Sequence, residues 1–176
     1  MEALRFLDPT LRALDGARAE LICFGAFEDQ RPLRQVAGLL DWRLAGKLSR
    51  MAKGGFLLGA DAETVLTPGR PRLPFDKLLI LGLGRVADFD ASVFSKWLGR
   101  LEAAVRGLGA KRALVELPGR GLLASERRAE LLQTLLPGEF LDGCVFIEAE
   151  ADRKFFVAKL RREGRARSAL GSSPER

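Results

Sequence analysis

The sequence predicts a single α/β domain built on a mixed, largely parallel six-stranded sheet with helices on both faces. Two observations support this fold class. Apolar stretches of strand length alternate along the chain with stretches whose apolar residues recur every three or four positions. The chain has 176 residues, 47% hydrophobic and 30% charged, which suits one sizeable core. Strands linked by helices favour a sheet that is covered on both sides.

The first half of the chain predicts three strands. The stretch "ALRF" is a short strand, and Asp8, followed by proline, is typical of a helix N-cap. "AELICFGAF" is apolar on both faces, as expected for a strand inside a sheet. Residues 32–53 carry apolar residues at helical spacing and predict one helix, or two that meet near Asp41. "AETVLTPG" is a strand that stops at Pro68.

The second half continues the alternation. "KLLILGLG" is the most apolar strand, and Asp88 or Asp90 is positioned to cap the helix that follows it. "RALVEL" is a strand, "ASERRAELLQTLL" a helix and "GCVFIEA" the sixth strand. A last helix is expected from about Asp152 to Arg162.

Positive charge is concentrated at the C-terminal end. The formal net charge is +6, and residues 152–176 hold eight basic and three acidic side chains, so the rest is nearly neutral. We expect a folded domain over residues 1–162 and a basic, disordered tail over residues 163–176. A solubilising tail, an arm that docks on an acidic partner, and a nucleic-acid contact are the three alternatives for this end. Its candidate interaction residues are Arg161, Arg162, Arg165 and Arg167.

Several kinds of catalytic chemistry are missing from the sequence. It contains no histidine and no tyrosine, which excludes a Ser-His-Asp triad and the usual zinc sites. Cys23 and Cys144 each lie in an apolar run, which is typical of buried strand thiols. The sequence shows neither a signal peptide nor a membrane span, so we expect a cytoplasmic protein without a membrane partner. No cofactor, metal site or catalytic residue is predicted.

Two groups of carboxylates have alternative interpretations. Glu126 and Glu130 lie four residues apart on a predicted helix, with two arginines between them, and we interpret them as a solvated helix face. Glu148 and Glu150 share one face of an extended segment and are suited to a cation. Because basic residues follow them directly, ion pairing is the favoured alternative.

A glycine motif follows the most apolar strand, in "FDKLLILGLGR". Such a motif either ends a strand tightly or holds a phosphate beyond the carboxyl end of the sheet. A second loop of this kind, "LPGRGLL", follows the next strand. We interpret both loops as structural, with phosphate binding as the alternative. The residues concerned are Gly82, Gly84, Arg85, Gly119, Arg120 and Gly121.

With these elements in order, the chain resembles the N-terminal domain of the leucyl aminopeptidase (cytosol aminopeptidase) family. The resemblance is carried by "ELICFGAFED", "LAGKLSRMAKGGFLLGADAETVLTPG", "DKLLILGLGRVADFD" and "LGAKRALVELP", and extends from about Leu4 to Leu160. It implies a fold akin to macro domains, whose glycine-rich loops bind the diphosphate of ADP-ribose. In the peptidase family, by contrast, the glycine motif occurs without a phosphate. The peptidase metals of that family lie in a separate C-terminal domain, and none of its metal motifs occurs here.

The resemblance and the missing chemistry together predict a non-enzymatic interaction or regulatory module that acts through protein contacts or self-association. Trp42, Phe89 and Trp97 are its aromatic candidates, with packing in the core as the alternative for each. A reader of ADP-ribose or a related nucleotide is the second hypothesis. A nucleic-acid accessory protein that uses the basic tail is the third.

Overall fold

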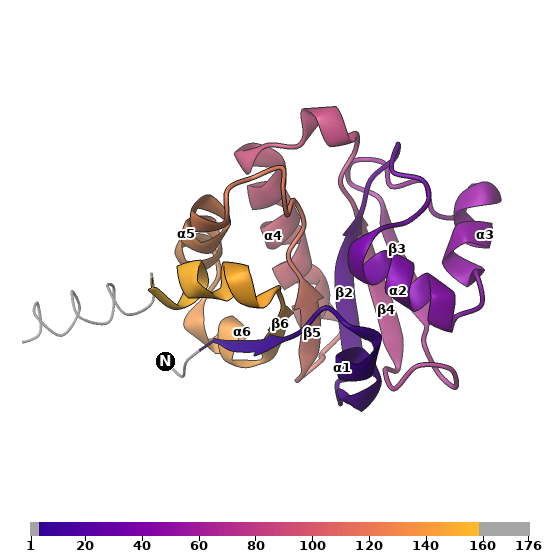
Figure 1. Cartoon of the computed structure of the whole chain (residues 1–176), viewed down its shortest axis with the longest axis horizontal. Coiled ribbons are helices and arrows are strands. Elements are labelled where there is room, and N and C mark those ends of the chain that lie inside the picture. The colour runs from indigo at the N-terminus through magenta and orange to yellow at the C-terminus, as the bar shows by residue number, and fades with distance from the viewer. Residues whose placement is uncertain (1–3, 159–176) are drawn as a thin grey trace, which may run out of the picture.

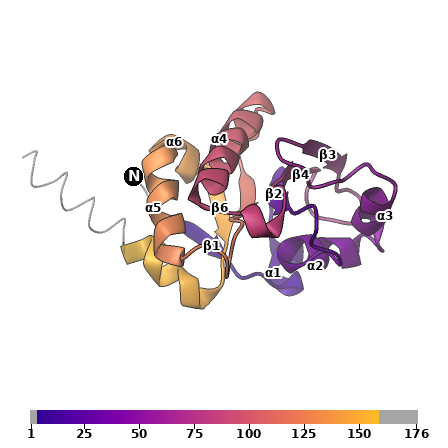
Figure 2. The same cartoon turned by 90° about the horizontal axis from the view of Figure 1, so that it is seen from above.

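The computed structural model describes residues 4–158 and contains one six-stranded sheet between two layers of helices (Figures 1 and 2). A helical segment over residues 150–158 follows the last strand. The other elements, in chain order, are β1 (Arg5–Leu7), α1 (Leu11–Gly16), β2 (Leu21–Ala26), α2 (Gln35–Arg43), α3 (Lys47–Lys53), β3 (Thr64–Pro68), β4 (Lys77–Gly82), η1 (Val86–Asp88), α4 (Ala91–Gly107), β5 (Ala113–Glu116), α5 (Ser125–Leu135), α6 (Gly138–Asp142) and β6 (Cys144–Ile147).

The strand order is β1-β6-β5-β2-β4-β3. Every neighbouring pair is parallel except β3 and β4, which are antiparallel. The predicted mixed, largely parallel six-stranded sheet is therefore confirmed. β2 lies between β4 and β5 in the middle of the sheet, which explains why both of its faces are apolar. β3 lies at one edge and ends at Pro68, where a missing N–H costs no ladder hydrogen bond.

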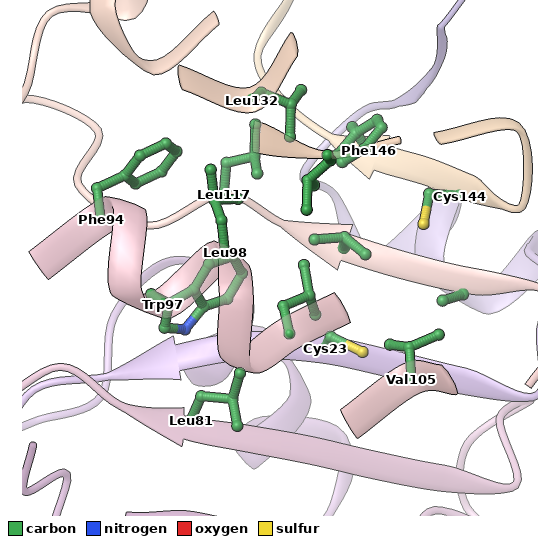
Figure 3. Packing of buried hydrophobic residues seen from close by; sticks show 14 of the residues in the cluster. Cys23, Leu81, Phe94, Trp97, Leu98, Val105, Leu117, Leu132, Cys144 and Phe146 are labelled. Atoms are coloured by element: carbon green, nitrogen blue, oxygen red, sulfur yellow. The ribbon is translucent and has the colours of Figure 1, made fainter. Parts of the chain in front are cut away.

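Alternate residues of the strands point into two separate cores. One face packs on α4, α5, α6 and the segment 150–158, and Figure 3 shows Trp97 and Leu98 of α4 in this core together with Leu132 of α5. The other face packs on α1, α2 and α3. Cys23 and Cys144 are free, buried thiols in the first core, so the expectation for them is confirmed.

Helix boundaries confirm part of the sequence-based expectations. Asp90 caps α4, because its Oδ1 accepts a hydrogen bond from the N–H of Val93 at 2.9 Å. Residues 32–53 form two helices, α2 and α3, rather than one. The expected cap at Asp8 is wrong. Thr10 caps α1 instead, while the Asp8 carboxylate pairs with Arg153.

Some expectations concern residues that the structure does not describe. The boundary at residue 162 and the basic tail after it lie outside residues 4–158, as does the end of the predicted last helix. The described part of that helix covers residues 150–158. Within residues 4–158, no helix combines the length and the apolar character needed to cross a membrane.

Gly99 lies on the exposed side of α4, where an added Cβ would meet no other atom within 4 Å. Alanine stabilises a helix interior by about 1 kcal/mol relative to glycine. We expect Gly99→Ala to raise the free energy of unfolding by about this amount in urea denaturation. Gly82→Ala is the contrast, since its Cβ would collide with the carbonyl oxygen of Ala60 and the variant should lose stability. A destabilised Gly99→Ala would contradict the placement of this residue.

Candidate functional site

The two glycine loops lie at the same edge of the sheet. Gly82 ends β4 and Gly119 follows β5, and both strands run parallel to β2 between them. Both loops therefore lie beyond the carboxyl ends of the central strands, where open α/β sheets bind ligands. The structure thus brings the predicted loop residues to one edge, and their backbone groups decide what that edge can bind.

Backbone groups of the first loop bond to the protein itself. The N–H of Gly84 donates to the carbonyl of Gly59 at 2.9 Å, and the N–H of Leu83 donates to the same carbonyl at 3.1 Å. The N–H of Val86 donates to Asp29 Oδ1 at 2.9 Å. These donors are the groups that would otherwise face a phosphate. The side chain of Arg85 is exposed, with its Nε 3.9 Å from Asp29 Oδ2.

An aromatic ring covers the second loop. Gly119 has φ +83°, and a Cβ there would collide with the ring of Phe89. Phe89 is only 8% exposed and packs edge-on against Phe27, with the ring centroids 5.4 Å apart. Gly121, with φ +80°, has no atom within 4 Å of an added Cβ. Glycine is needed at position 119 because an aromatic ring lies directly against its backbone.

A buried ion cluster lies beside this loop. Glu148, just after β6, accepts a hydrogen bond from Arg128 Nη1 at 2.8 Å and another from Arg120 Nε at 3.0 Å. Arg128 and Glu148 are both fully buried. Ser125 Oγ accepts from Arg128 Nη2 at 3.1 Å and donates to Asp152 Oδ1 at 2.7 Å. The cluster therefore ties α5, β6 and the helical segment 150–158 to the loop after β5.

Glu116, the last residue of β5, extends the cluster towards α2. Its Oε1 accepts a hydrogen bond from the N–H of Val36 in the first turn of α2, at 3.1 Å. Burial raises the pKa of Glu116 to about 7, and Glu148 adds to this shift. The Val36 hydrogen bond, Arg120 and Arg128 act in the opposite direction, because each favours the charged carboxylate.

Two guanidinium nitrogens of the cluster are buried without a hydrogen-bond partner within residues 4–158: Arg120 Nη2 and Arg128 Nε. A buried donor without a partner costs about 1–3 kcal/mol. Arg120 is the more accessible of the two side chains, at 24% exposure. It is therefore the group at this edge that is best suited to an added anion.

Sequence reasoning missed this cluster. Glu126 and Glu130 were expected on a solvated helix face, and Glu126 is exposed, but Arg128 between them is fully buried. The available signal was its spacing, three and four residues before the buried Leu131 and Leu132 on the same helix face.

For Glu148, ion pairing rather than cation binding is what the structure shows. Its carboxylate pairs with Arg120 and Arg128. Arg153, one of the basic residues that follow it in sequence, donates instead to the backbone carbonyl of Glu148 at 2.9 Å. Within residues 4–158, no group of histidine, cysteine and acidic side chains is arranged to hold a metal ion.

The three aromatic candidates occupy different environments. Trp97 is 1% exposed and stacks on Phe94, and Phe89 is buried as described above. For these two residues the structure corrects the interaction interpretation, since neither ring is accessible to a partner. Trp42, at 67% exposure, lies on the surface near the end of α2. The four arginines proposed for the tail lie outside the described residues.

Further exposed apolar side chains, which the sequence did not single out, follow Trp42 along the chain. Phe56 is 73% exposed, and Leu58 and Leu66 are exposed as well. Phe56 and Leu58 follow α3, and Leu66 lies on β3. We call the end of the molecule that carries Trp42, Phe56, Leu58 and Leu66 the α2–β3 side. Figure 2 shows α2 and β3 apart from each other at this end, with α3 at its tip. Leu66 lies opposite Leu79 of the α4-side core, so its side chain is on the sheet face that α2 and α3 do not cover.

The raised pKa of Glu116 predicts a pH dependence of stability. The folded state holds a proton that the unfolded chain loses near pH 4.5, so stability falls as pH rises from about 4.5 to about 7. The loss should approach about 3 kcal/mol. Glu116→Gln keeps an acceptor for the Val36 N–H without a charge and should flatten this slope in urea denaturation across that range. Glu126→Gln, at an exposed position on α5, should leave the slope unchanged. An unaltered slope in Glu116→Gln would contradict the assignment.

Comparison with known proteins agrees with the fold. The family model described as the N-terminal domain of the cytosol aminopeptidase family matches residues 23–136. A probable cytosol aminopeptidase of Halorhodospira halophila is 32% identical over 130 residues, which are 69% of this chain and 26% of that protein. The corresponding protein of Pseudomonas fluorescens is 28% identical over 119 residues, 66% of this chain and 24% of its own. The chain thus spans about a quarter of the length of these relatives.

Solved structures show the same architecture. A macrodomain of Oceanobacillus iheyensis with MES bound superposes with a TM-score of 0.67 at 12% identity, over 87% of this chain and 89% of its own. The Trypanosoma brucei macrodomain in complex with ADP gives 0.67 at 17% identity, over 88% and 67%. A variant of tomato leucine aminopeptidase gives 0.56 at 15% identity, over 89% and 36%. At these identities the likeness shows the fold alone. The family match and the shared fold together show that this chain belongs to the cytosol aminopeptidase family, as its macrodomain-like N-terminal domain.

Proposed function

We propose that this chain is a non-enzymatic interaction module that associates through its α2–β3 side, with a second copy of itself as the first partner to test. The observation that carries the proposal is the exposure of two large aromatic side chains, Trp42 at 67% and Phe56 at 73%. Large aromatics contribute most of the binding energy in many protein interfaces, because they bury much apolar area with little loss of side-chain entropy.

Contacts around Trp42 support its role as an anchor. The guanidinium of Arg43 lies 5.0 Å from the centre of the Trp42 ring, and Arg43 Nε is also hydrogen-bonded to Asp15 Oδ1 at 3.0 Å. A cation held over the ring restrains the indole while leaving most of its surface to solvent. A restrained side chain loses less entropy on binding than a mobile one.

Edge strand β3 adds a second means of association. Within the described residues β3 pairs only with β4, so its outer edge presents unpaired backbone groups. Leu66 is exposed on this strand. Backbone pairing at an edge and apolar contact beside it favour protein partners over small ligands.

Family membership supports a role without catalysis. The matched region is the N-terminal domain, about a quarter of the relatives' length, and the sequence contains no histidine, the commonest general base. The same proposal places the chain in the cytoplasm, in keeping with its relatives, which are probable cytosol aminopeptidases.

Binding of ADP-ribose or a related nucleotide is the second candidate. It is favoured by the buried, unpartnered Nη2 of Arg120 between Gly119 and Gly121, and by the macrodomain fold, since the Trypanosoma brucei macrodomain has been solved with ADP and with ADP-ribose. Two observations argue against nucleotide binding. The N–H groups of the first loop already donate to acceptors in the protein, and the ring of Phe89 packs against Gly119 of the second loop.

Self-association should be visible in sedimentation equilibrium. We expect the weight-average mass of the wild-type chain to rise above 19.3 kDa with concentration. Trp42→Ser combined with Phe56→Ser should stay at the monomer mass while keeping the wild-type melting temperature, because both side chains are exposed. Leu122→Ser, which removes an exposed apolar side chain from the loop before α5, is the matched control and should associate like the wild type. A wild-type chain that stays monomeric at every concentration would refute self-association.

A thermal-shift titration with ADP-ribose distinguishes the second candidate. A ligand at a hundred times its Kd stabilises the folded state by about 2.7 kcal/mol. We expect no change in melting temperature with millimolar ADP-ribose, because the N–H groups of Leu83 and Gly84 in the first loop already donate to the carbonyl of Gly59. A saturable shift that Gly84→Val abolishes, without unfolding the domain, would establish nucleotide binding instead.

A further inference from the structure

A cavity lies at the end of the sheet opposite the glycine loops. It opens between the C-terminal turn of α4, helix α6 and the amino ends of β5 and β6, and has a volume of about 360 Å³. This volume lies within the range of small-molecule pockets. Its lining residues are Val105, Arg106, Ala110, Lys111, Glu139, Phe140, Gly143 and Cys144.

The buried side chains in the lining of the cavity are apolar. Val105, Phe140 and Cys144 are all buried members of the core between the sheet and α4 to α6. Burial raises the pKa of the Cys144 thiol to about 12, so this side chain is uncharged at neutral pH. The interior therefore favours an aromatic or aliphatic group over a strongly hydrated one.

Charges are confined to the rim. Arg106 donates from Nε to Glu102 and from Nη2 to Glu139, both at 2.9 Å, so the Glu139 carboxylate already has a cationic partner. Lys111 is exposed, and its backbone N–H donates to Glu20 Oε2 at 3.2 Å. Its ammonium group makes no ion pair with any side chain in the described range 4–158. Among the charged lining residues, Arg106 and Glu139 thus pair with each other, and Lys111 is the one whose charge has no ion-pair partner in the described range.

We propose that this cavity binds a small organic anion with an apolar or aromatic body and a single carboxylate. The body would pack on Val105, Phe140 and Cys144, while the carboxylate would pair with the Lys111 ammonium. A cationic ligand would meet the unpaired charge of Lys111, and a purely polar anion would gain nothing from the interior. This site is separate from the α2–β3 side, so it does not depend on the proposed function.

Phenylacetate, phenylacetamide and phenethylamine are matched probes, since they share one ring and differ in charge. In amide NMR titrations at neutral pH we expect saturable shifts with phenylacetate, centred on Val105, Lys111 and Cys144. Phenylacetamide should bind about tenfold more weakly, as expected for the loss of one charge-assisted contact worth about 1.4 kcal/mol. Phenethylamine should bind more weakly still.

Two neighbouring basic residues provide the decisive variants. Lys111→Met keeps most of the aliphatic stem and removes the charge, so phenylacetate and phenylacetamide should then bind equally. Arg112→Met alters the next residue, which is exposed but does not line the cavity, and should keep the preference for the carboxylate. Both variants should melt like the wild type.

Three results would overturn the proposal. The first is the absence of saturable shifts with millimolar phenylacetate in the wild-type chain. The second is equal binding of phenylacetate and phenylacetamide by the wild type, since Lys111 would then select nothing. The third is an equal loss of preference in Lys111→Met and Arg112→Met, which would show a diffuse charge effect rather than a site.

Discussion

The ion pair between Arg128 and Glu148 is the constraint on which the carboxyl edge of the sheet depends. Neither side chain reaches solvent, so removing one would leave an unpaired charge in the interior at a cost of about 3–5 kcal/mol. Arg128 lies on α5 and Glu148 follows β6, and the pair therefore fixes the helix against the end of the strand. Arg120 also donates a hydrogen bond to the Glu148 carboxylate, which anchors the loop after β5 to the same pair.

Open α/β sheets commonly bind ligands at the carboxyl ends of their strands. In this protein that edge is largely occupied by contacts within the chain. The Glu116 carboxylate holds the first turn of α2, and the Phe89 ring lies on Gly119. A shared fold does not imply a shared ligand, and the macrodomain likeness at low identity leaves function to the site itself. The features available to a partner lie elsewhere: exposed aromatic side chains on the α2–β3 side, and a cavity at the end of the sheet opposite the glycine loops, where Lys111 has no ion-pair partner within residues 4–158. The two surfaces differ in chemistry, and we propose a protein as the partner of the first and a small organic anion as the ligand of the second.

Local sequence patterns were sufficient for the elements and for the fold class. Alternation of strand-length and helix-period stretches depends only on neighbouring residues, and so does the cap at Asp90, whose acceptor lies three residues from its donor. The edge position of β3 agrees with Pro68, which lacks an N–H. The cap at Asp8 was mistaken because its carboxylate pairs with Arg153, a residue 145 positions away that no local pattern identifies. The short helix α6 was missed because five residues carry too little periodicity.

The sequence by itself determined the α/β alternation, the two-faced apolar strands and the family resemblance, since each is encoded within a few neighbouring residues or in ordered blocks along the chain. Only the tertiary structure decided the strand order and the fate of single side chains. Trp42 and Trp97 both occur on helices, yet one is exposed and the other fully packed, because burial depends on which elements cover a helix face. Arg128 is buried because Glu148, twenty residues further along the chain, meets it in space. A charged helix residue is predicted to be exposed unless an oppositely charged partner is known, and only the fold shows that Glu148 is the partner of Arg128.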